Sequence, residues 1–259
     1  MLKKRKINLR PKVVVVMPAY NAAGTLEKTY RDIPKNLVDD IILVDNNSRD
    51  HTVELAKKLK IKVYRHKTNR GYGGSQKTLY RKALDMGADI IIMVHPDYQY
   101  DPKFLKYLLP PIIDGAFDIM LATRIRTRKD TLKNGMPLWK YIPNRFLTWL
   151  ENTIFQTHVT DYHNGYRAFT ADFLHQIPLD LLSDKFDFDT DILIQAAIRK
   201  ARIAEIPHPT RYEDENSQMP FKKAVRYGLM IAVTVVHYLL HKAGIWKQKA
   251  FEVKHVKVE

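Results

Sequence analysis

The chain has 259 residues, 45% of them hydrophobic, and a formal net charge of +15 at pH 7. This length and apolar content suit one sizeable globular domain and argue against disorder as the main state. The sequence has no cysteine, which excludes disulfide scaffolds, thiolate zinc sites and cysteine nucleophiles.

The positive charge is concentrated in residues 1–12, 124–145 and 220–259, and the rest of the chain is slightly acidic. Such local patches attract anionic partners, so membrane phosphates and nucleic acid are both candidates. The basic N-terminus is not followed by an apolar run of the signal-peptide type. We therefore do not expect secretion.

Strand and helix patterns alternate four times in the first half of the sequence. Short apolar runs predict buried strands at 13–17, 39–45, 61–66 and 88–94, and a helical pattern follows each of them. Near-continuous apolar strands of this kind are typical of a parallel sheet that is covered by helices on both faces. The predicted fold class is therefore α/β.

Each predicted strand is followed by a polar segment, namely PAYN, DNNS, NRGYGG and HPDYQ. In open α/β sheets, ligands bind outside the carboxyl ends of the strands. We therefore expect these four loops, distant in the sequence, to converge on one crevice.

The second half has a less regular pattern, with predicted strands at 117–124 and 201–208 and predicted helices at 139–156 and 187–200. We expect one main domain at 1–219 and a basic amphipathic helix and tail at 220–259.

The longest apolar stretch, YGLMIAVTVVHYLL at 227–240, has about 14 residues, whereas a membrane-spanning helix needs roughly 20. It should therefore not cross a bilayer alone. Its basic flanks favour a helix that lies in an anionic membrane interface. The alternative is a helix packed on the domain or on a dimer partner.

The segment after the 88–94 strand contains candidate metal ligands. Asp97 offers a hard oxygen suited to Mg²⁺ or Mn²⁺, Gln99 could add a carbonyl, and His95 would favour Mn²⁺. The alternative is that Asp97 and Asp101 only cap the helix predicted near residue 102. The glycines of NRGYGG favour either a phosphate contact or a tight turn.

Arginines form a third group of candidates. Arg124, Arg145, Arg167 and Arg211 lie at the ends of predicted elements, and arginine suits bidentate phosphate contacts. No G-x-S-x-G segment is present, so a serine hydrolase is disfavoured.

Eight segments, in this order, resemble one known family: VVVVMPAYNAAGTL, IILVDNNSRDHT, NRGYGGSQKT, ADIIIMVHPDYQYDP, LATR, DYHNGYRAFTADFL, FDFDTDILIQA and EIPHPTRY. The sequence from about residue 12 to about residue 225 is similar to the inverting family 2 glycosyltransferases with a GT-A fold. The most similar subgroup is the dolichol-phosphate mannosyltransferase and polyprenyl-phosphate glycosyltransferase type.

The resemblance implies a role for each matching residue. The donor nucleotide sugar would be bordered by Pro18, Ala19, Tyr20, Asn21, Asp45, Asn69, Gly71, His95 and Asp97, with Asp45 on the base. The divalent ion, Mg²⁺ or Mn²⁺, would be held by Asp97, Gln99 and His95. The acceptor phosphate would be bound by Arg145, Arg167 and Arg211, and the catalytic set would be Asp97, Asp161, Arg124, Arg167, Asp189 and Asp191.

Some positions depart from the family's pattern. Asn46 and Asn47 replace the usual Asp and Gly, Ala22 replaces an acid, and His95 replaces the first acid of the metal-binding motif. The imidazole is either a metal ligand or a hydrogen-bond partner of a donor phosphate that partly replaces metal charge. Dependence on a metal therefore stays open at this point.

The resemblance implies transfer of a hexose, with inversion, from a donor of the GDP-mannose or UDP-glucose type to a polyprenyl or dolichyl phosphate. The protein would act at the cytoplasmic face of a membrane as a peripheral enzyme. A hydroxyl acceptor is the alternative, and it would need Asp161, Asp189 or Asp191 as a general base. A second alternative is a non-catalytic basic protein that binds membranes or nucleic acid, but no nucleic-acid partner is expected.

Overall fold

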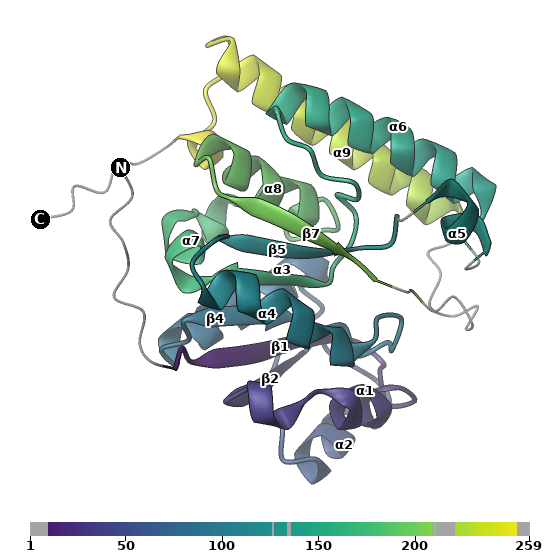
Figure 1. Ribbon diagram of the computed structural model, residues 1–259, viewed down its shortest axis with the longest axis vertical. Coiled ribbons are helices and arrows are strands. Elements are labelled where there is room, and N and C mark those ends of the chain that lie inside the picture. Colours follow the sequence, from purple (N-terminus) through teal and green to yellow (C-terminus); the bar gives the residue numbers. More distant parts are fainter. Residues whose placement is uncertain (1–9, 126, 134–135, 209, 211–220, 253–259) are drawn as a thin grey trace, which may run out of the picture.

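The computed structural model describes residues 10–125, 127–133, 136–208, 210 and 221–252 (Figure 1). Its centre is a seven-stranded sheet with the order β3-β2-β1-β4-β6-β5-β7. The strands are β1 (Val13–Ala19), β2 (Asp40–Asp45), β3 (Lys62–Arg65), β4 (Ile90–Met93), β5 (Ile119–Thr123), β6 (Arg167–Thr170) and β7 (Ile203–Pro207).

Helices cover both faces of the sheet. One face packs against α1 (Leu26–Asp32), α2 (Thr52–Lys58) and α4 (Leu105–Ile113). The other face packs against α3 (Gly71–Asp85), α6 (Leu138–Phe155), α7 (Ala171–Gln176), α8 (Phe188–Ile198) and α9 (Phe221–Lys242). The short helix α5 is Arg128–Lys133, and 3₁₀ turns occur at Lys35–Leu37, Pro102–Phe104, Leu179–Leu181 and Lys249–Phe251.

The sheet is mixed, although most of its pairs are parallel as predicted. Strand β6 lies antiparallel between β4 and β5, with Arg167 opposite Met93 and Leu121. The sequence analysis did not predict this strand, because its four residues, RAFT, contain no run of apolar side chains. The reversed direction brings the chain into the sheet at the edge where the parallel strands end.

That edge collects the loops that the sequence analysis expected to meet. Ala19 and Asp45 lie opposite each other at the ends of β1 and β2, and β4 and β5 end at the same edge. Strand β6 begins at this edge, so the segment before it also lies there.

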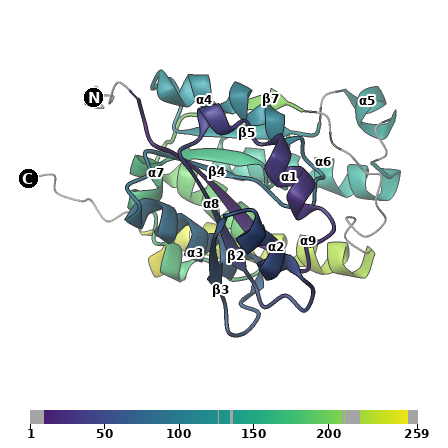
Figure 2. The same cartoon turned by 90° about the horizontal axis from the view of Figure 1, so that it is seen from below.

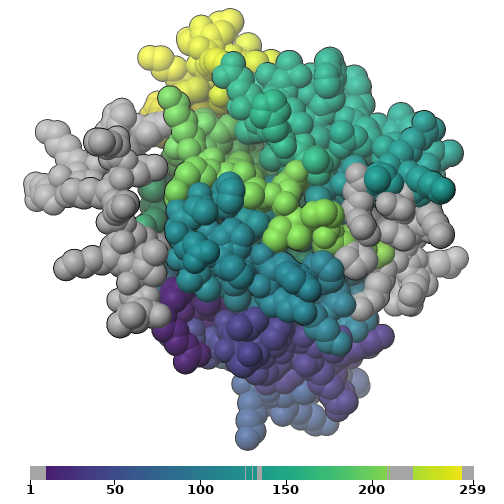
Figure 3. All heavy atoms as spheres, in the orientation of Figure 1, coloured from purple at the N-terminus to yellow at the C-terminus, as the bar shows by residue number. Residues whose placement is uncertain are grey.

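Helices α6 and α9 pack side by side (Figures 1 and 2). In the space-filling view, α6 and the C-terminal segment lie at the end of the molecule opposite the N-terminal strand and helix (Figure 3). The predicted domain boundary at residues 219 and 220 is not tested, because residues 211–220 lie outside the described residues.

Helix α9 is longer than its apolar stretch suggests. By length and composition alone, Ala224–Lys242 could cross a membrane, which is weak evidence for a span. One side of the helix packs against the rest of the protein, because Ile231 and Val235 are buried in the main core cluster. The packing therefore favours a helix that lies along the protein.

Candidate active site

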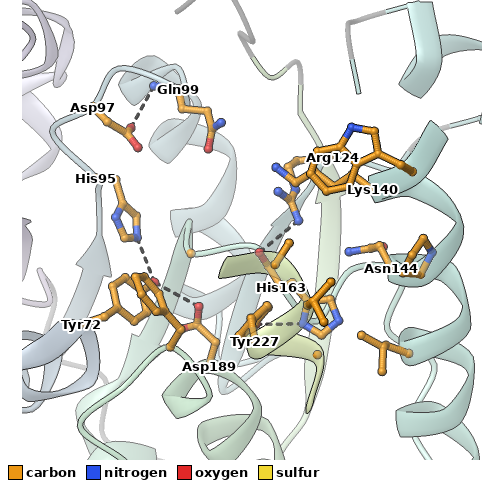
Figure 4. Close-up of a pocket in the computed structure, with 18 of the residues that line it drawn as sticks. Tyr72, His95, Asp97, Gln99, Arg124, Lys140, Asn144, His163, Asp189 and Tyr227 are labelled. Atoms are coloured by element: carbon orange, nitrogen blue, oxygen red, sulfur yellow. Dashed lines mark hydrogen bonds between the residues drawn. The ribbon is translucent and has the colours of Figure 1, made fainter. Parts of the chain in front are cut away.

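A cavity of about 350 Å³ opens where the sheet edge meets α6 and α9 (Figure 4). Its polar wall comes from Tyr72, His95, Asp97, Gln99, Tyr100, Arg124, His163 and Asp189. Its other wall comes from two helices, with Trp139, Lys140, Pro143, Asn144 and Leu147 on α6 and Ala224, Val225, Tyr227 and Gly228 on α9. The cavity is thus polar at the sheet and mainly apolar at the helices.

The segment after β4 brings Asp97 and Gln99 to the cavity. The Gln99 N–H donates to Asp97 Oδ1 at 3.0 Å, and Tyr98 between them has a φ of 57°. Asp101 instead accepts the Lys103 N–H at the start of the 3₁₀ turn Pro102–Phe104. The capping alternative is therefore confirmed for Asp101, whereas Asp97 is a residue of the cavity wall.

A carboxylate and an amide side chain on one wall fit Mg²⁺ or Mn²⁺, since both ions prefer oxygen ligands. No group of three or more His, Asp and Glu side chains in the described part of the chain is arranged to hold a metal by itself. Asp97 and Gln99 would hold the ion, and the remaining ligands would come from water and a donor diphosphate, as is common for Mg²⁺.

His95 is held by neighbours on two sides. Its ring stacks on Tyr72 with centroids 5.6 Å apart, and its Nε2 lies 3.3 Å from the Tyr72 hydroxyl. Tyr72 donates to Asp189 Oδ2 at 3.0 Å. A Cβ on Gly165 would collide with the His95 ring, so a glycine is required there. The row Asp189–Tyr72–His95 thus fixes the orientation of the imidazole.

The residues expected at the donor base lie at the ends of β1 and β2. Asp45 is fully buried, and its carboxylate accepts the Ser48 N–H at 3.3 Å and pairs with Arg65 Nε at 3.3 Å. Asn21 has a φ of 51°, and its N–H donates to Ser48 Oγ. Pro18, Ala19 and the exposed Tyr20 complete this part of the edge.

The glycine segment joins this part of the edge to the cavity. Asn46 donates to Asn69 Oδ1 and to the Gly71 carbonyl oxygen, at 3.0 and 3.2 Å. The helix α3 already begins at Gly71, so part of the predicted loop is helical. A Cβ on Gly73 would collide with the Ser183 carbonyl oxygen, so this glycine is explained by close packing of α3.

Arg124 and Asp161 form a buried bidentate ion pair beside the cavity. Arg124 Nε and a terminal nitrogen donate to the two carboxylate oxygens at 2.6 and 2.9 Å. Burial alone would raise the pKa of Asp161, but the charge and hydrogen bonds of Arg124 lower it well below its usual range. Lys140 lines the cavity from α6, and burial, followed by the charge of Arg124, lowers its pKa to about 8. This end of the cavity is positive.

The other predicted arginines lie elsewhere. The buried Arg167 does not line the cavity, and its guanidinium donates to the carbonyl oxygens of Tyr162, Asn164 and Asp189. Arg145 donates to the Thr160 carbonyl oxygen at 2.7 Å and is also absent from the lining. The two arginines support the loop before β6. Arg211 lies outside the described residues.

The remaining two carboxylates differ in position. Asp189 lines the cavity and accepts hydrogen bonds from Tyr72 and Gln76. Asp191 is buried and accepts the Ser183 N–H at 2.8 Å, away from the cavity lining. Burial raises the pKa of Asp191 to about 7.

The sequence analysis missed six polar residues of the cavity, namely Tyr72, Tyr100, Lys140, Asn144, His163 and Tyr227. Tyr72 and His163 lie inside the quoted segments NRGYGG and DYHNGYR, so those segments could have indicated them. Lys140 and Tyr227 lie on helices that carry no motif, and only the packing of α6 and α9 reveals them.

Residues 14–177 match the family model described as glycosyl transferase family 2. A UDP-N-acetylglucosamine–dolichyl-phosphate N-acetylglucosaminyltransferase from Methanococcus voltae is 28% identical over 219 residues, covering 78% of this chain and 86% of the relative. An undecaprenyl-phosphate mannosyltransferase from Micrococcus luteus is 27% identical over 210 residues, covering 76% and 82%.

The fold has close structural neighbours. Glucosyl-3-phosphoglycerate synthase from Mycobacterium tuberculosis, in complex with Mn²⁺, UDP and glucosyl-3-phosphoglycerate, matches with a TM-score of 0.68 and 19% identity. The match covers 91% of this chain and 81% of that chain. This likeness shows the GT-A-like fold. Because the family model covers more than half of its length, this chain belongs to glycosyl transferase family 2.

Proposed function

We propose that this glycosyltransferase moves a hexose from a nucleotide sugar to a polyprenyl phosphate at a membrane surface. The observation that carries this proposal is the composition of the cavity. Metal-capable oxygens of Asp97 and Gln99 lie on one wall, and the positive Arg124 and Lys140 lie beside an apolar wall from α6 and α9. A phosphate attached to an apolar chain complements the second group.

The donor end supports a nucleotide diphosphate. When bound, a divalent ion would neutralise the charge that grows on the leaving diphosphate. Asp97 and Gln99 would hold that ion, and the end of β2 that carries Asp45 would lie at the base. The synthase from M. tuberculosis was crystallised with Mn²⁺ and UDP, and the relative from Methanococcus voltae is named for a UDP sugar. A uridine donor is therefore the first to test.

None of the three candidate general bases is well placed to deprotonate a hydroxyl, which favours an acceptor that is already anionic. Asp161 is held ionised by Arg124, both Asp189 oxygens accept hydrogen bonds, and Asp191 lies off the cavity. A phosphate oxygen is a nucleophile without deprotonation, whereas a hydroxyl needs a base near it. The two relatives are named for dolichyl and undecaprenyl phosphate, which supports the same class of acceptor.

Helices α6 and α9 support a location at the membrane surface. The buried residues of α6 are Asn144, Thr148, Glu151 and Phe155, so three of the four are polar, whereas five large apolar side chains of the helix are exposed. A helix on a water-exposed surface usually has the opposite distribution, with apolar side chains buried and polar side chains exposed. The exposed apolar side chains are Leu138, Trp139, Ile142, Phe146 and Trp149 on α6, and Val225, Leu229, Val233, Val236 and Leu239 on α9.

We infer that these exposed side chains, here called the α6–α9 apolar face, enter the headgroup region of an anionic bilayer. Basic residues such as Arg226 and Lys242 on α9 complement anionic lipid. Since the cavity is lined by the same two helices, a lipid phosphate could pass from the bilayer to Arg124 without leaving an apolar surface. The cytoplasmic side is proposed because nucleotide sugars are made there.

The apolar face gives a direct prediction. Changing Phe146→Glu and Leu229→Glu together should weaken binding to vesicles that contain anionic lipid by tenfold or more, since burying each apolar side chain contributes about 1.5–3 kcal/mol. Co-sedimentation with vesicles measures this. The control is Leu181→Glu, which alters a side chain of similar exposure on another part of the surface: 52% compared with 59% for Phe146 and 64% for Leu229. Equal binding of both variants would contradict the proposed face.

The function itself is tested with purified protein, a labelled UDP or GDP sugar, Mn²⁺ or Mg²⁺, and a short-chain polyprenyl phosphate. The matching polyprenyl alcohol is the control acceptor. We expect a lipid-linked sugar from the phosphate and none from the alcohol. Transfer to the alcohol, or to a soluble phosphorylated hydroxyl compound in preference to the lipid, would favour the hydroxyl-acceptor alternative.

A further inference from the structure

A buried row of polar side chains leads from α8 to the cavity and is not explained by donor or metal binding. It begins at Thr190 on α8, whose hydroxyl donates to Glu151 Oε1 at 3.1 Å. Glu151 Oε2 lies 3.5 Å from His163 Nε2. His163 Nδ1 lies 3.0 Å from the Tyr227 hydroxyl, and His163 and Tyr227 both line the cavity. Figure 4 shows the contact between these last two residues.

One proton is needed between Glu151 and His163. Glu151 Oε2 and His163 Nε2 are both buried, and neither makes a hydrogen bond within the described part of the chain. Leaving either atom unpaired is unfavourable, and burying a lone carboxylate is more unfavourable still. A single proton between the two atoms satisfies both, and its position decides which atom is the donor.

The surroundings place that proton on Glu151. Oε1 accepts from Thr190, so Oε2 is the oxygen that can carry a proton toward His163. The Thr190 hydrogen bond lowers the pKa of Glu151, but burial outweighs it and raises that pKa to about 8. Burial also lowers the pKa of His163 to about 4, and Arg124 and Arg167 act in the same direction against the opposing charge of Asp161, so both groups are neutral near pH 7.

The position of the proton on Glu151 determines which atoms of His163 and Tyr227 act as hydrogen-bond donors. If Glu151 Oε2–H donates to His163 Nε2, then His163 carries its own proton on Nδ1 and donates it to the Tyr227 oxygen. The Tyr227 O–H is then turned toward the cavity as a donor. If Glu151 were ionised and His163 carried its proton on Nε2, Tyr227 would donate to His163 Nδ1. The cavity would then face only a lone pair.

We propose that Glu151 and His163 are positioning residues that make Tyr227 a hydrogen-bond donor to the anionic oxygen of the acceptor. The inference rests on the proposed function, because it assigns Tyr227 to the acceptor phosphate alongside Arg124 and Lys140. Three donors, one directly after β5 and the others on α6 and α9, then line the cavity that would hold this anion. The row also ties the membrane-facing helix α9 to the His163 loop, whose carbonyl oxygen accepts from Arg124.

The variants Tyr227→Phe, Glu151→Gln and Glu151→Met test this inference in the full-length chain. Tyr227→Phe should raise the KM for short-chain polyprenyl phosphate by about tenfold or more, because a hydrogen bond to a charged group contributes roughly 1.5–3 kcal/mol. The KM for the donor sugar should not change. Glu151→Gln should behave like the parent protein, since the amide N–H donates to His163 and the amide oxygen accepts from Thr190.

Glu151→Met removes the donor but keeps an unbranched side chain of similar length. It should raise the acceptor KM as Tyr227→Phe does, and the double variant should be no worse than Tyr227→Phe alone. A similar loss in Glu151→Gln and Glu151→Met, or an unchanged acceptor KM in Tyr227→Phe, would overturn the proposal.

Nitrogen-15 NMR of the histidines gives a readout that does not depend on turnover. His163, identified from a spectrum of His163→Gln, should carry its proton on Nδ1 in the parent protein and in Glu151→Gln. A proton on Nε2 in the parent protein contradicts the inference. If the parent protein uses no lipid phosphate at all, the proposed function fails, whereas the NMR result still decides the direction of the row.

Discussion

Replacing Asp97 with Asn should lower the rate of sugar transfer by about 10³-fold, which is the largest effect on activity that we expect from one side chain. Asp97 and Gln99 are the carboxylate and the amide side chain that the segment after β4 presents to the cavity. Stabilisation of charge on a leaving group by a positioned ion or donor contributes several kcal/mol, and losing it costs 10²–10³-fold or more.

The matched control is Asp101→Asn, four residues further along the same segment. Asp101 caps the 3₁₀ turn by accepting the Lys103 N–H, and asparagine is an equally good cap. Its transfer rate should stay within about twofold of the parent protein, since the cap is kept. Titration calorimetry adds a second readout, because Mn²⁺ should tighten UDP binding in the parent protein and in Asp101→Asn but much less in Asp97→Asn. An active Asp97→Asn variant with normal Mn²⁺ dependence would rule out the assigned role.

His95 stands where the resemblance to family 2 glycosyltransferases led us to expect an acid, and the transfer rate and Mn²⁺ titration of a His95 variant would test its role. The Asp189–Tyr72–His95 row engages Nε2 and holds the ring in place. A metal-bound histidine commonly donates its other ring N–H to an oxygen, and this row has that form. Because Tyr72 donates its proton to Asp189, His95 Nε2–H donates to Tyr72, and Nδ1 of a neutral ring is then an acceptor that suits a metal ion and not a phosphate oxygen. The role of His95 as a metal ligand stays a prediction.

The strands of the first half were predictable because their signal is local. Valine and isoleucine runs such as 13–16 and 90–92 have few stable places other than a sheet buried on both faces. The convergence of the loops then followed from parallel topology alone. Strand β6 has no such signal, because RAFT begins with a buried arginine whose partners are backbone carbonyl oxygens of the preceding loop and of α8. Its insertion between β4 and β5 depends on long-range pairing.

The orientation of α6 shows a second limit. The helix was predicted almost to the residue, at 139–156 compared with Leu138–Phe155. Helical periodicity shows that Trp139, Ile142, Phe146 and Trp149 share one side, but it does not show whether protein, water or lipid covers that side. The usual expectation that the apolar side is buried is reversed here. Likewise, Glu151 and His163 are brought together by a turn that no local pattern encodes.

The arginines that were predicted to bind phosphate differ in their roles in the structure. Residue type and position at the end of an element favoured four phosphate-binding arginines, but hydrogen-bond geometry distinguishes them. Arg167 and Arg145 support backbone carbonyl oxygens, whereas Arg124 lies on the cavity wall. A buried guanidinium has five donors to satisfy, so burial among carbonyl oxygens leaves little capacity for a ligand. Arg124 is the described arginine best placed to meet an acceptor phosphate.

The ion pair of Arg124 and Asp161 should give the largest effect on stability. Removing one partner, as in Asp161→Leu or Arg124→Met, should lower the free energy of unfolding by about 3–5 kcal/mol, because an uncompensated charge is left buried. The double variant should lose much less, since it removes both charges. Urea denaturation at pH 7 measures all three. The control is Arg202→Met, which breaks a partly exposed pair with Asp118 and should cost about 1 kcal/mol or less.

The pH dependence of the same pair has a definite sign. The folded-state pKa of Asp161 is depressed, so the pair stabilises the protein above the ordinary carboxyl pKa of about 3.9. That contribution is lost as the pH falls below this value toward the folded-state pKa. From pH 5 to pH 3, the parent protein should therefore lose more stability than the double variant. Equal losses in both, or single variants as stable as the double, would show that the pair contributes little.

Activity then separates the two roles of Arg124. If the guanidinium only neutralises Asp161, the double variant should regain sugar transfer together with stability. If Arg124 also binds the acceptor phosphate, the double variant should be stable but slow, with a raised KM for the lipid phosphate and an unchanged KM for the donor sugar. We expect the second result, because Arg124 lines the cavity next to Lys140 whereas Asp161 lies behind it and is absent from the lining. A stable, fully active double variant would move the acceptor phosphate to Lys140 and Tyr227.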